Sequence, residues 1–185
     1  FTYGTKSPIK QYNRNKLLWQ DRSVDGIKTG HTEEAGYCLV ASAIRDNMRL
    51  ISVVMGTDGE DSRAKASRVN LNYGFRFYET HNLYKSGDVI TDVKVWKADT
   101  DTLELTVKDD FYITVPRGQY KKLESLVEVD NKIIAPIKEA AYQGILKILL
   151  SNETIASVPL LAKKSISKGS IFNRLKDEIH LMLFD

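Results

Sequence analysis

Two apolar, β-rich runs lie close together in the first third of the chain, over residues 37–45 and 48–56. The residues between them, Asp46 and Asn47, both tolerate a positive φ and favour a tight two-residue hairpin. Because the hydrophobic residues of both runs are almost continuous, the pattern predicts two strands of a sheet that is covered on both faces. Residues 1–36 are polar and rich in turn-forming residues, which is typical of loops leading into a strand.

A helix is predicted directly after this hairpin. Apolar residues recur at helical spacing between Ser62 and Tyr78, and Asp61 or Ser62 is placed to cap the first turn. The residues that define this spacing are Ala66, Val69, Tyr73 and Phe77. We expect them to form the face with which an amphipathic helix covers the sheet.

Beyond residue 79 the pattern changes to short segments in which apolar and polar residues alternate. These segments include Val93 and Val95, then Leu103, Leu105 and Val107, then Val127 and Val129. Turn-forming residues recur between the segments at the spacing of a small all-β sandwich, at 108–110, 130–131 and 151–152. We therefore expect a β-rich second domain over residues 80–168, after a first domain over residues 1–79.

The last segment, residues 169–185, predicts an amphipathic helix after a Gly-Ser break. The apolar residues that define one side of this helix are Phe172, Leu175, Ile179 and Met182. Arg174 and Lys176 are balanced by Asp177 and Glu178, so the polar side of the helix is nearly neutral.

Composition and charge narrow the class of protein. The chain has 185 residues, of which 42% are apolar and 28% charged, as in an ordinary globular protein. Its net charge of +3 comes from basic and acidic residues spread along the sequence, without the clustered basic face that nucleic-acid binding requires. No run approaches the roughly 20 apolar residues of a membrane-spanning helix, and the N-terminus lacks the order of a secretory signal. A start at Phe1 indicates processing or a fragment.

Few residues offer redox or metal chemistry. Cys38 is the only cysteine, which excludes an internal disulfide, and its place in an apolar run predicts a buried small side chain. His81 and His180 have no cysteine or paired carboxylate at ligand spacing, so the sequence predicts neither a metal site nor a cofactor.

Residues 24–32 carry the candidate chemistry, with the sequence VDGIKTGHT. An isolated Lys-Thr-Gly triplet recurs by chance and is then usually a turn with a surface lysine. Here the longer string, together with Asn-Arg-Asn and Leu-Leu-Trp over residues 13–19 and Val-Val-Met-Gly over 53–56, resembles the low-molecular-mass penicillin-binding D-alanyl-D-alanine carboxypeptidases. This resemblance spans nearly the whole chain, which is similar to the C-terminal portion of such a protein.

The resemblance implies a fold and a function. The fold is a fragment of an α/β penicillin-binding, serine β-lactamase-like domain with a central antiparallel sheet and covering helices, then an all-β sandwich-like domain and an amphipathic helix. The function is that of a periplasmic serine-type carboxypeptidase, which removes the terminal D-alanine of peptidoglycan pentapeptide through an acyl-enzyme and is acylated by β-lactam antibiotics. The terminal helix would attach the protein to the inner membrane surface; the alternative is that it packs on its own domain or a neighbour.

The resemblance also implies roles for the residues of the triplet. In this family the triplet lies on an edge strand along which the peptide substrate aligns. Gly30 allows the substrate backbone to approach closely, and Lys28 supplies a positive charge beside the nucleophile. Thr29 offers a hydroxyl to the terminal carboxylate, and the backbone N–H of His31 forms one half of the oxyanion hole.

Arg14 and Arg63 match family positions that surround the substrate carboxylate. A guanidinium pairs with a carboxylate through two charge-assisted hydrogen bonds, which suits recognition of a free C-terminus. The alternative for both is solvated surface charge, since Arg63 lies beside Lys65 and Arg68 on a helix with a polar outer side.

The nucleophile motifs of the family are missing from this sequence. Its catalysis needs a Ser-x-x-Lys tetrad and a Ser-x-Asn, and no Ser-x-Asn occurs. Ser-x-x-Lys begins at Ser7, Ser62 and Ser165, but each lies at the wrong place relative to the triplet. We expect that penicillin acylates none of them, and that this chain is inert without the N-terminal half of the protein.

Other functions remain open at this point. Within the same family they are an endopeptidase or a β-lactamase, although the β-rich tail after Thr80 does not belong to the single-domain β-lactamase architecture. From a different class, the second domain could act as a non-catalytic module that binds cell wall or partner proteins.

Overall fold

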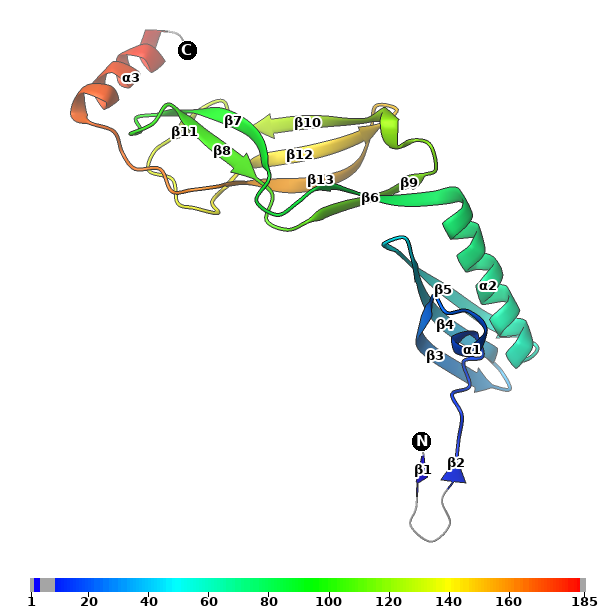
Figure 1. The fold of residues 1–185 in the computed structure, drawn as a ribbon. Coiled ribbons are helices and arrows are strands. Elements are labelled where there is room, and N and C mark those ends of the chain that lie inside the picture. The colour runs from blue at the N-terminus through cyan, green and yellow to red at the C-terminus, as the bar shows by residue number, and fades with distance from the viewer. Residues whose placement is uncertain (1, 4–8, 184–185) are drawn as a thin grey trace. The chain divides into compact units, whose positions relative to one another are not determined.

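The computed structural model describes residues 2–3 and 9–183 and separates the chain into two units, Phe1–Thr80 and His81–Asp185. Each unit has its own hydrophobic core. Figure 1 shows the elements of both units along the chain.

The first unit is built on an antiparallel sheet of three strands in the order β3-β4-β5. These strands are Val24–Thr32, Gly36–Arg45 and Met48–Thr57. The predicted hairpin is confirmed, because Arg45 pairs with Met48 and both residues between them have a positive φ. Its smaller elements are β1 (Thr2–Tyr3), which pairs with β2 (Ile9–Lys10), and helix α1 (Leu17–Gln20).

Strand β3 is the main departure from the hydrophobic pattern, which placed residues 24–32 among loops. The segment has few apolar residues and two glycines, so it carries no alternation of its own. Its backbone nevertheless pairs with β4 from Val24 to Thr32, and this pairing makes it a strand. The edge strand implied by the family resemblance therefore exists.

Helix α2 (Glu60–Phe77) lies at the predicted place but buries a different face. The buried side chains are Arg63, Ala64, Ser67 and Leu71, and the N-cap is Gly59 without a side-chain bond. Val69 and Tyr73, expected against the sheet, are both 59% exposed. The prediction was wrong because small side chains allow the helix to approach the sheet closely. Gly74 has no room for a Cβ beside Leu50.

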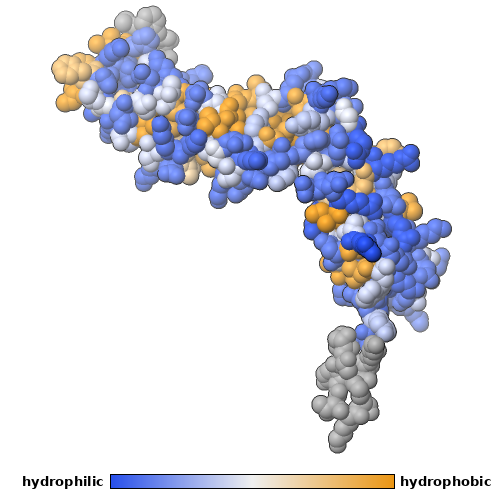
Figure 2. Space-filling view, in the orientation of Figure 1, coloured by the Kyte–Doolittle hydropathy of each residue, from blue (hydrophilic) through white to orange (hydrophobic). Residues whose placement is uncertain are grey.

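The sheet of the first unit is covered on one face only. Leu39, Ala41 and Ala43 of β4 belong to the core cluster that α2 completes. On the other face, Val53 and Met55 of β5 are 54% and 72% exposed. The expectation of two covered faces is thus wrong for this chain taken alone, and Figure 2 shows apolar residues at the surface of the first unit.

The second unit is mostly β-structure, as predicted. A sheet of six strands has the order β10-β12-β13-β8-β7-β11, and β6 pairs with β9 in a separate ladder. The strands are β6 (Tyr78–Tyr84), β7 (Val89–Trp96), β8 (Thr102–Thr106), β9 (Phe111–Pro116), β10 (Leu123–Val129), β11 (Ile133–Ile134), β12 (Tyr142–Leu150) and β13 (Glu153–Ala162). A short 3-10 helix, η1 (Tyr120–Lys122), precedes β10. The predicted turn at Ser151 and Asn152 joins β12 to β13, with a positive φ at both residues.

The predicted terminal helix is present as α3 (Ile171–Leu183). Its polar side contacts the loop after β7: the backbone N–H of Lys97 donates to Asp177 Oδ2 at 2.5 Å, and Lys97 Nζ forms an ion pair with Glu178. Most of its described apolar side chains are exposed, including Phe172 at 85%. Over the part of the chain that the structure describes, no helix is both long enough and apolar enough to cross a membrane.

Candidate functional site

All of the residues predicted for the site line one pocket of about 420 Å³ in the first unit. It is lined by Arg14, Lys28, Thr29, Gly30, His31, Tyr37, Glu60 and Arg63. These residues come from the loop before α1, from β3, from the start of β4 and from the first turn of α2. The fold thus joins segments that are far apart in the sequence.

Strand β3 presents its outer edge to this pocket, because β4 is the only neighbour of β3 in the sheet of the described chain. Gly30 pairs with Cys38 across the ladder. A Cβ added to Gly30 would meet only the Cβ of Cys38, at an ordinary distance of 3.7 Å. Packing within this chain therefore does not require glycine here, which is consistent with space kept for another molecule.

The other triplet residues surround this edge. Lys28 is exposed, and its Nζ donates to the Thr29 carbonyl oxygen at 2.6 Å. The ring of His31 lies 3.9 Å from the ring of Tyr37, the residue opposite it on β4. The triplet lies within a strand rather than in an isolated turn, and it lines a pocket.

Arg63 is buried, so the alternative of a solvated surface charge is wrong for this residue. Its Nη1 donates to the carbonyl oxygens of Gly30 at 3.2 Å and Cys38 at 3.5 Å. Its Nη2 donates to the carbonyl oxygen of Arg14 at 3.2 Å and lies 3.6 Å from a carboxylate oxygen of Glu60. One guanidinium therefore connects β3, β4, α2 and the loop before α1.

The loop that carries Arg14 is held by its flanking asparagines. Asn15 is buried; its Nδ2 donates to the Gly26 carbonyl oxygen at 3.1 Å, and its Oδ1 accepts the N–H of Leu17. Asn13 Oδ1 accepts the N–H of Asn15. Arg14 itself is exposed between them, so the loop presents its guanidinium to the pocket while the asparagines fix the backbone to β3.

The charges around the pocket favour an anionic ligand. Among the lining residues, Arg14, Lys28 and Arg63 are cationic, while Glu60 is the only carboxylate. Glu60 also lies 3.6 Å from Lys16, whose hydrogen bond to Asp61 raises the pKa of the Lys16 ammonium. Because Glu60 has cationic neighbours of its own, the net field of the pocket is positive.

None of the described Ser-x-x-Lys serines belongs to this pocket. Ser62 is exposed at the start of α2, and the Oγ of Ser165, in the second unit, accepts the N–H of Glu139 at 2.9 Å. Ser7 lies outside the described residues. The two histidines that the sequence set aside, His81 and His180, belong to no group of three potential metal ligands within the described residues.

The sequence analysis missed three residues of the site: Tyr37, Glu60 and Asn15. Tyr37 could have been found from the register, since the hairpin between β3 and β4 places it opposite His31. Glu60 precedes Arg63 by one helical turn, which favours an ion pair.

Cys38, expected to be buried, is half-buried, and its thiol contacts the Ala35 carbonyl oxygen at 3.4 Å.

Comparison with known families assigns the two units separately. Residues 1–59 match the family described as D-alanyl-D-alanine carboxypeptidase, and residues 78–168 match the family described as the C-terminal domain of penicillin-binding protein 5. The chain is 43% identical over 180 residues to the D-alanyl-D-alanine carboxypeptidase DacA of Escherichia coli, which covers 96% of this chain and 45% of that protein.

More distant relatives agree with this assignment. The carboxypeptidase DacF of Bacillus subtilis is 35% identical over 165 residues, covering 89% of this chain and 42% of its own length. Among solved structures, penicillin-binding protein 5 from Haemophilus influenzae matches with a TM-score of 0.82 and 36% identity, over 90% of this chain and 49% of that one. The chain spans less than half the length of each of these relatives.

Proposed function

This chain belongs to the family of penicillin-binding D-alanyl-D-alanine carboxypeptidases, and from that premise we propose that the whole protein removes the terminal D-alanine from peptidoglycan pentapeptide. In the proposed reaction a serine oxygen forms an ester with the penultimate D-alanine, the C–N bond to the terminal D-alanine breaks, and a proton passes to the leaving amine. Water then hydrolyses the ester. The gathering of Lys28, Thr29, Gly30 and His31 in one cationic pocket carries the proposal.

In this proposal the substrate lies along the free edge of β3. Gly30 leaves room for its backbone, and the Thr29 hydroxyl, with Arg14 beside it, binds the terminal carboxylate. Lys28 favours the anionic groups of the substrate and assists proton transfer to and from the serine. The N–H of His31 stabilises the negative charge that develops on the carbonyl oxygen. Arg63 lines the same pocket but is buried.

The serine would come from the part of the protein that lies outside this chain. The exposed apolar residues of β5 support this proposal, because Ile51, Val53 and Met55 form a continuous apolar surface on one face of the sheet. Strand β5 is also an edge of the sheet within the described chain. An uncovered face beside an open edge is a position at which more of the same domain would pack. Penicillins would acylate the same serine as substrate mimics.

We also propose that the protein lies in the periplasm with α3 on the surface of the inner membrane. Exposure of Ile171, Phe172 and Met182, each above 75%, supports insertion of this helix between lipid head groups. Since the charges on the polar side balance, binding would depend mainly on apolar insertion. Flotation with neutral phosphatidylcholine vesicles tests the contact with a membrane, and wild-type protein that does not float would contradict it.

The test of the enzymatic proposal is release of D-alanine by the full-length protein from a peptide ending in D-Ala-D-Ala. We expect turnover in the wild type, a loss of at least about 100-fold in a Lys28→Ala variant, and a penicillin adduct on a serine outside this chain. Wild-type protein that neither turns over the peptide nor forms an adduct would exclude the proposed function. An adduct on Ser7, Ser62 or Ser165 would contradict the proposed location of the nucleophile.

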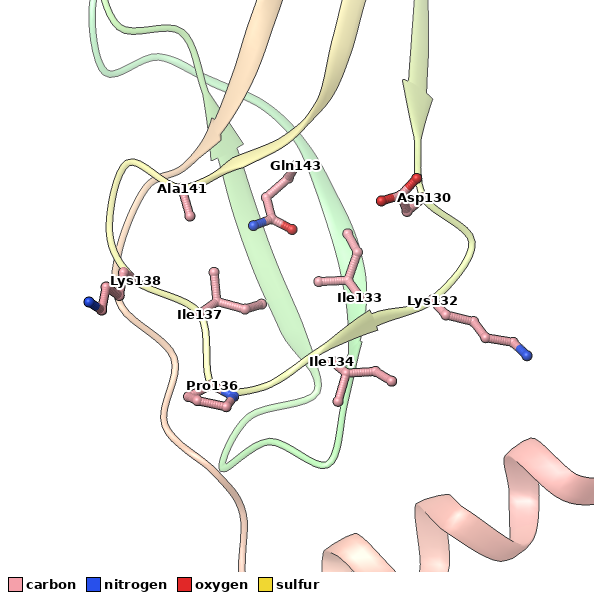
Figure 3. Close-up of a pocket in the computed structure, with 9 residues that line it drawn as sticks. All are labelled: Asp130, Lys132, Ile133, Ile134, Pro136, Ile137, Lys138, Ala141 and Gln143. Atoms are coloured by element: carbon pink, nitrogen blue, oxygen red, sulfur yellow. The ribbon is translucent and has the colours of Figure 1, made fainter.

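A second candidate function is supported by a pocket in the second unit. Figure 3 shows this pocket, of about 430 Å³, with Ile133 and Ile137 inside and Lys132 and Lys138 pointing outward at its rim. Two lysines and one carboxylate, Asp130, line this pocket and could pair with the charged groups of a peptide, which supports a non-catalytic role in binding cell wall or partner proteins. Sedimentation of the protein with insoluble peptidoglycan, compared with a Lys132→Gln, Lys138→Gln double variant, distinguishes this role. Equal sedimentation would rule it out.

A further inference from the structure

The carbonyl oxygen of Gly30 and the N–H of His31 belong to one peptide group. Arg63 Nη1 donates to that carbonyl oxygen at 3.2 Å, from a side chain that is only 3% exposed. The same Nη1 donates to the Cys38 carbonyl oxygen on β4 at 3.5 Å, so the guanidinium lies against both strands.

A planar trans peptide couples its two polar ends. Its C=O and N–H point in opposite directions, so a donor that holds the oxygen also fixes the direction of the N–H. A charged donor on the oxygen further polarises the amide and makes its N–H a stronger donor. Arg63 acts on the carbonyl end of the Gly30–His31 peptide, and its effect is therefore transmitted to the N–H of His31.

We propose that Arg63 is a positioning residue for the oxyanion hole, which acts through the Gly30–His31 peptide rather than by contact with the substrate. This inference rests on the proposed function, in which the N–H of His31 stabilises the oxyanion. Arg63 holds this peptide in the orientation that directs the N–H of His31 to the outer edge of β3, before any substrate binds.

The surroundings of Arg63 support positioning more strongly than binding of a carboxylate. Its Nη atoms already donate to three main-chain carbonyl oxygens, those of Arg14, Gly30 and Cys38, and a substrate carboxylate would have to compete with them. Glu60, 3.6 Å away, balances its charge. Arg14 is exposed at the same pocket and is therefore better placed for the carboxylate.

Tyr37 contributes to the same arrangement. Its ring lies 3.9 Å from the ring of His31 and 5.5 Å from the Arg63 guanidinium carbon. Aromatic faces attract a guanidinium, so Tyr37 contacts both Arg63 and the ring of His31. These contacts add to the hydrogen bonds that hold Arg63 beside the Gly30–His31 peptide.

The experiment compares acylation of the full-length protein by benzylpenicillin and by its methyl ester, which lacks the free carboxylate. Arg63→Ala and Arg63→Lys variants should be acylated about 100-fold more slowly than wild type by both probes, because misplacing one oxyanion donor costs about that factor. Guanidinium ion added to Arg63→Ala should restore part of the rate. Lys65→Gln, an exposed change on the same helix, serves as the control and should leave both rates unchanged.

Two results would overturn the inference. A loss confined to benzylpenicillin would mean that Arg63 binds the carboxylate, and unchanged rates with both probes would mean that it has no role in acylation. If Arg63→Ala does not fold, as judged by circular dichroism, the Arg63→Lys variant decides alone, because it keeps the charge in the buried site. Wild-type protein that reacts with neither probe would instead refute the proposed function.

Discussion

Replacement of Asp177 by alanine should release helix α3 from the second unit. Asp177 Oδ2 accepts the backbone N–H of Lys97 at 2.5 Å, a charge-assisted hydrogen bond worth about 2 kcal/mol. The neighbouring ion pair between Lys97 and Glu178 is half-exposed and adds at most about 1 kcal/mol. Most of the described apolar residues of α3 are exposed, and a further contact places the ring of His180 5.4 Å from the ring of Trp96.

A loss of about 2 kcal/mol raises the equilibrium constant for undocking of α3 roughly 30-fold. Because isolated helices shorter than about 12–15 residues are marginal in water, the undocked 13-residue helix should also melt. Alanine has a higher helix propensity than aspartate, so faster exchange of α3 in this variant could not be caused by a lower helix propensity at residue 177. Amide hydrogen exchange over residues 171–183, read by mass spectrometry, should therefore accelerate about 30-fold.

The control is Lys176→Ala, an exposed neighbour on the same helix, which should change the exchange rate less than about twofold. If Asp177→Ala leaves the exchange of α3 as slow as in the wild type, the contact with Lys97 does not hold the helix, and the reasoning is refuted. Exchange that is already fast in the wild type would refute it equally, since the helix would then be undocked from the start.

Three further predictions concern the first unit. Leu71→Ala should lower the free energy of unfolding by about 2–5 kcal/mol because Leu71 is buried. Tyr73→Ala in this chain should lower it by less than about 1 kcal/mol because Tyr73 is exposed, and equal losses in denaturant titrations would contradict the assigned helix face. Burial raises the pKa of Asp21, but hydrogen bonds from Ser23 and an ion pair with Arg45 outweigh it, so the pKa is lowered. The ionised Asp21 carboxylate therefore stabilises the fold above about pH 4, and this contribution is lost as the pH falls through the lowered pKa. An Asp21→Asn variant should lose less stability on acidification than the wild type, and parallel pH–stability curves would refute this. Gly30→Ala should change the free energy of unfolding by less than about 0.5 kcal/mol, because the added Cβ meets only an ordinary contact within this chain. It should slow acylation of the full-length protein by penicillin at least tenfold, because the added methyl group would stand between β3 and the ligand. A normal acylation rate would contradict substrate alignment along β3.

Local signals predicted the elements that depend on neighbouring residues. Asp46 and Asn47 suit a two-residue hairpin whatever surrounds them, and the turn formed as expected. The β-rich second unit and the terminal helix also followed from alternation and helical spacing. Strand β3 did not, because Lys28, Thr29 and Gly30 have no pattern of their own and become a strand only through pairing with β4.

The face of helix α2 shows why spacing alone was not enough. Val69, Tyr73 and Phe77 form a regular apolar stripe. The sheet, however, presents the small residues Ala41 and Ala43 to the helix, so the helix packs close to the sheet and leaves little space for large side chains between them. The helix therefore buries Ala64, Ser67 and Leu71 together with Arg63, and the larger apolar stripe remains exposed. Packing volume, which depends on both partners, decided the rotation of the helix.

The sequence by itself determined the family resemblance, which rests on a short string around Lys28 and predicts a site for a peptide with a free carboxylate. Only the tertiary structure decided what Arg63 does, because its burial and its bonds to Arg14, Gly30 and Cys38 depend on segments up to 49 residues apart in the chain. Residue identity is a local property, whereas desolvation and hydrogen-bond partners arise only when distant segments pack against one another.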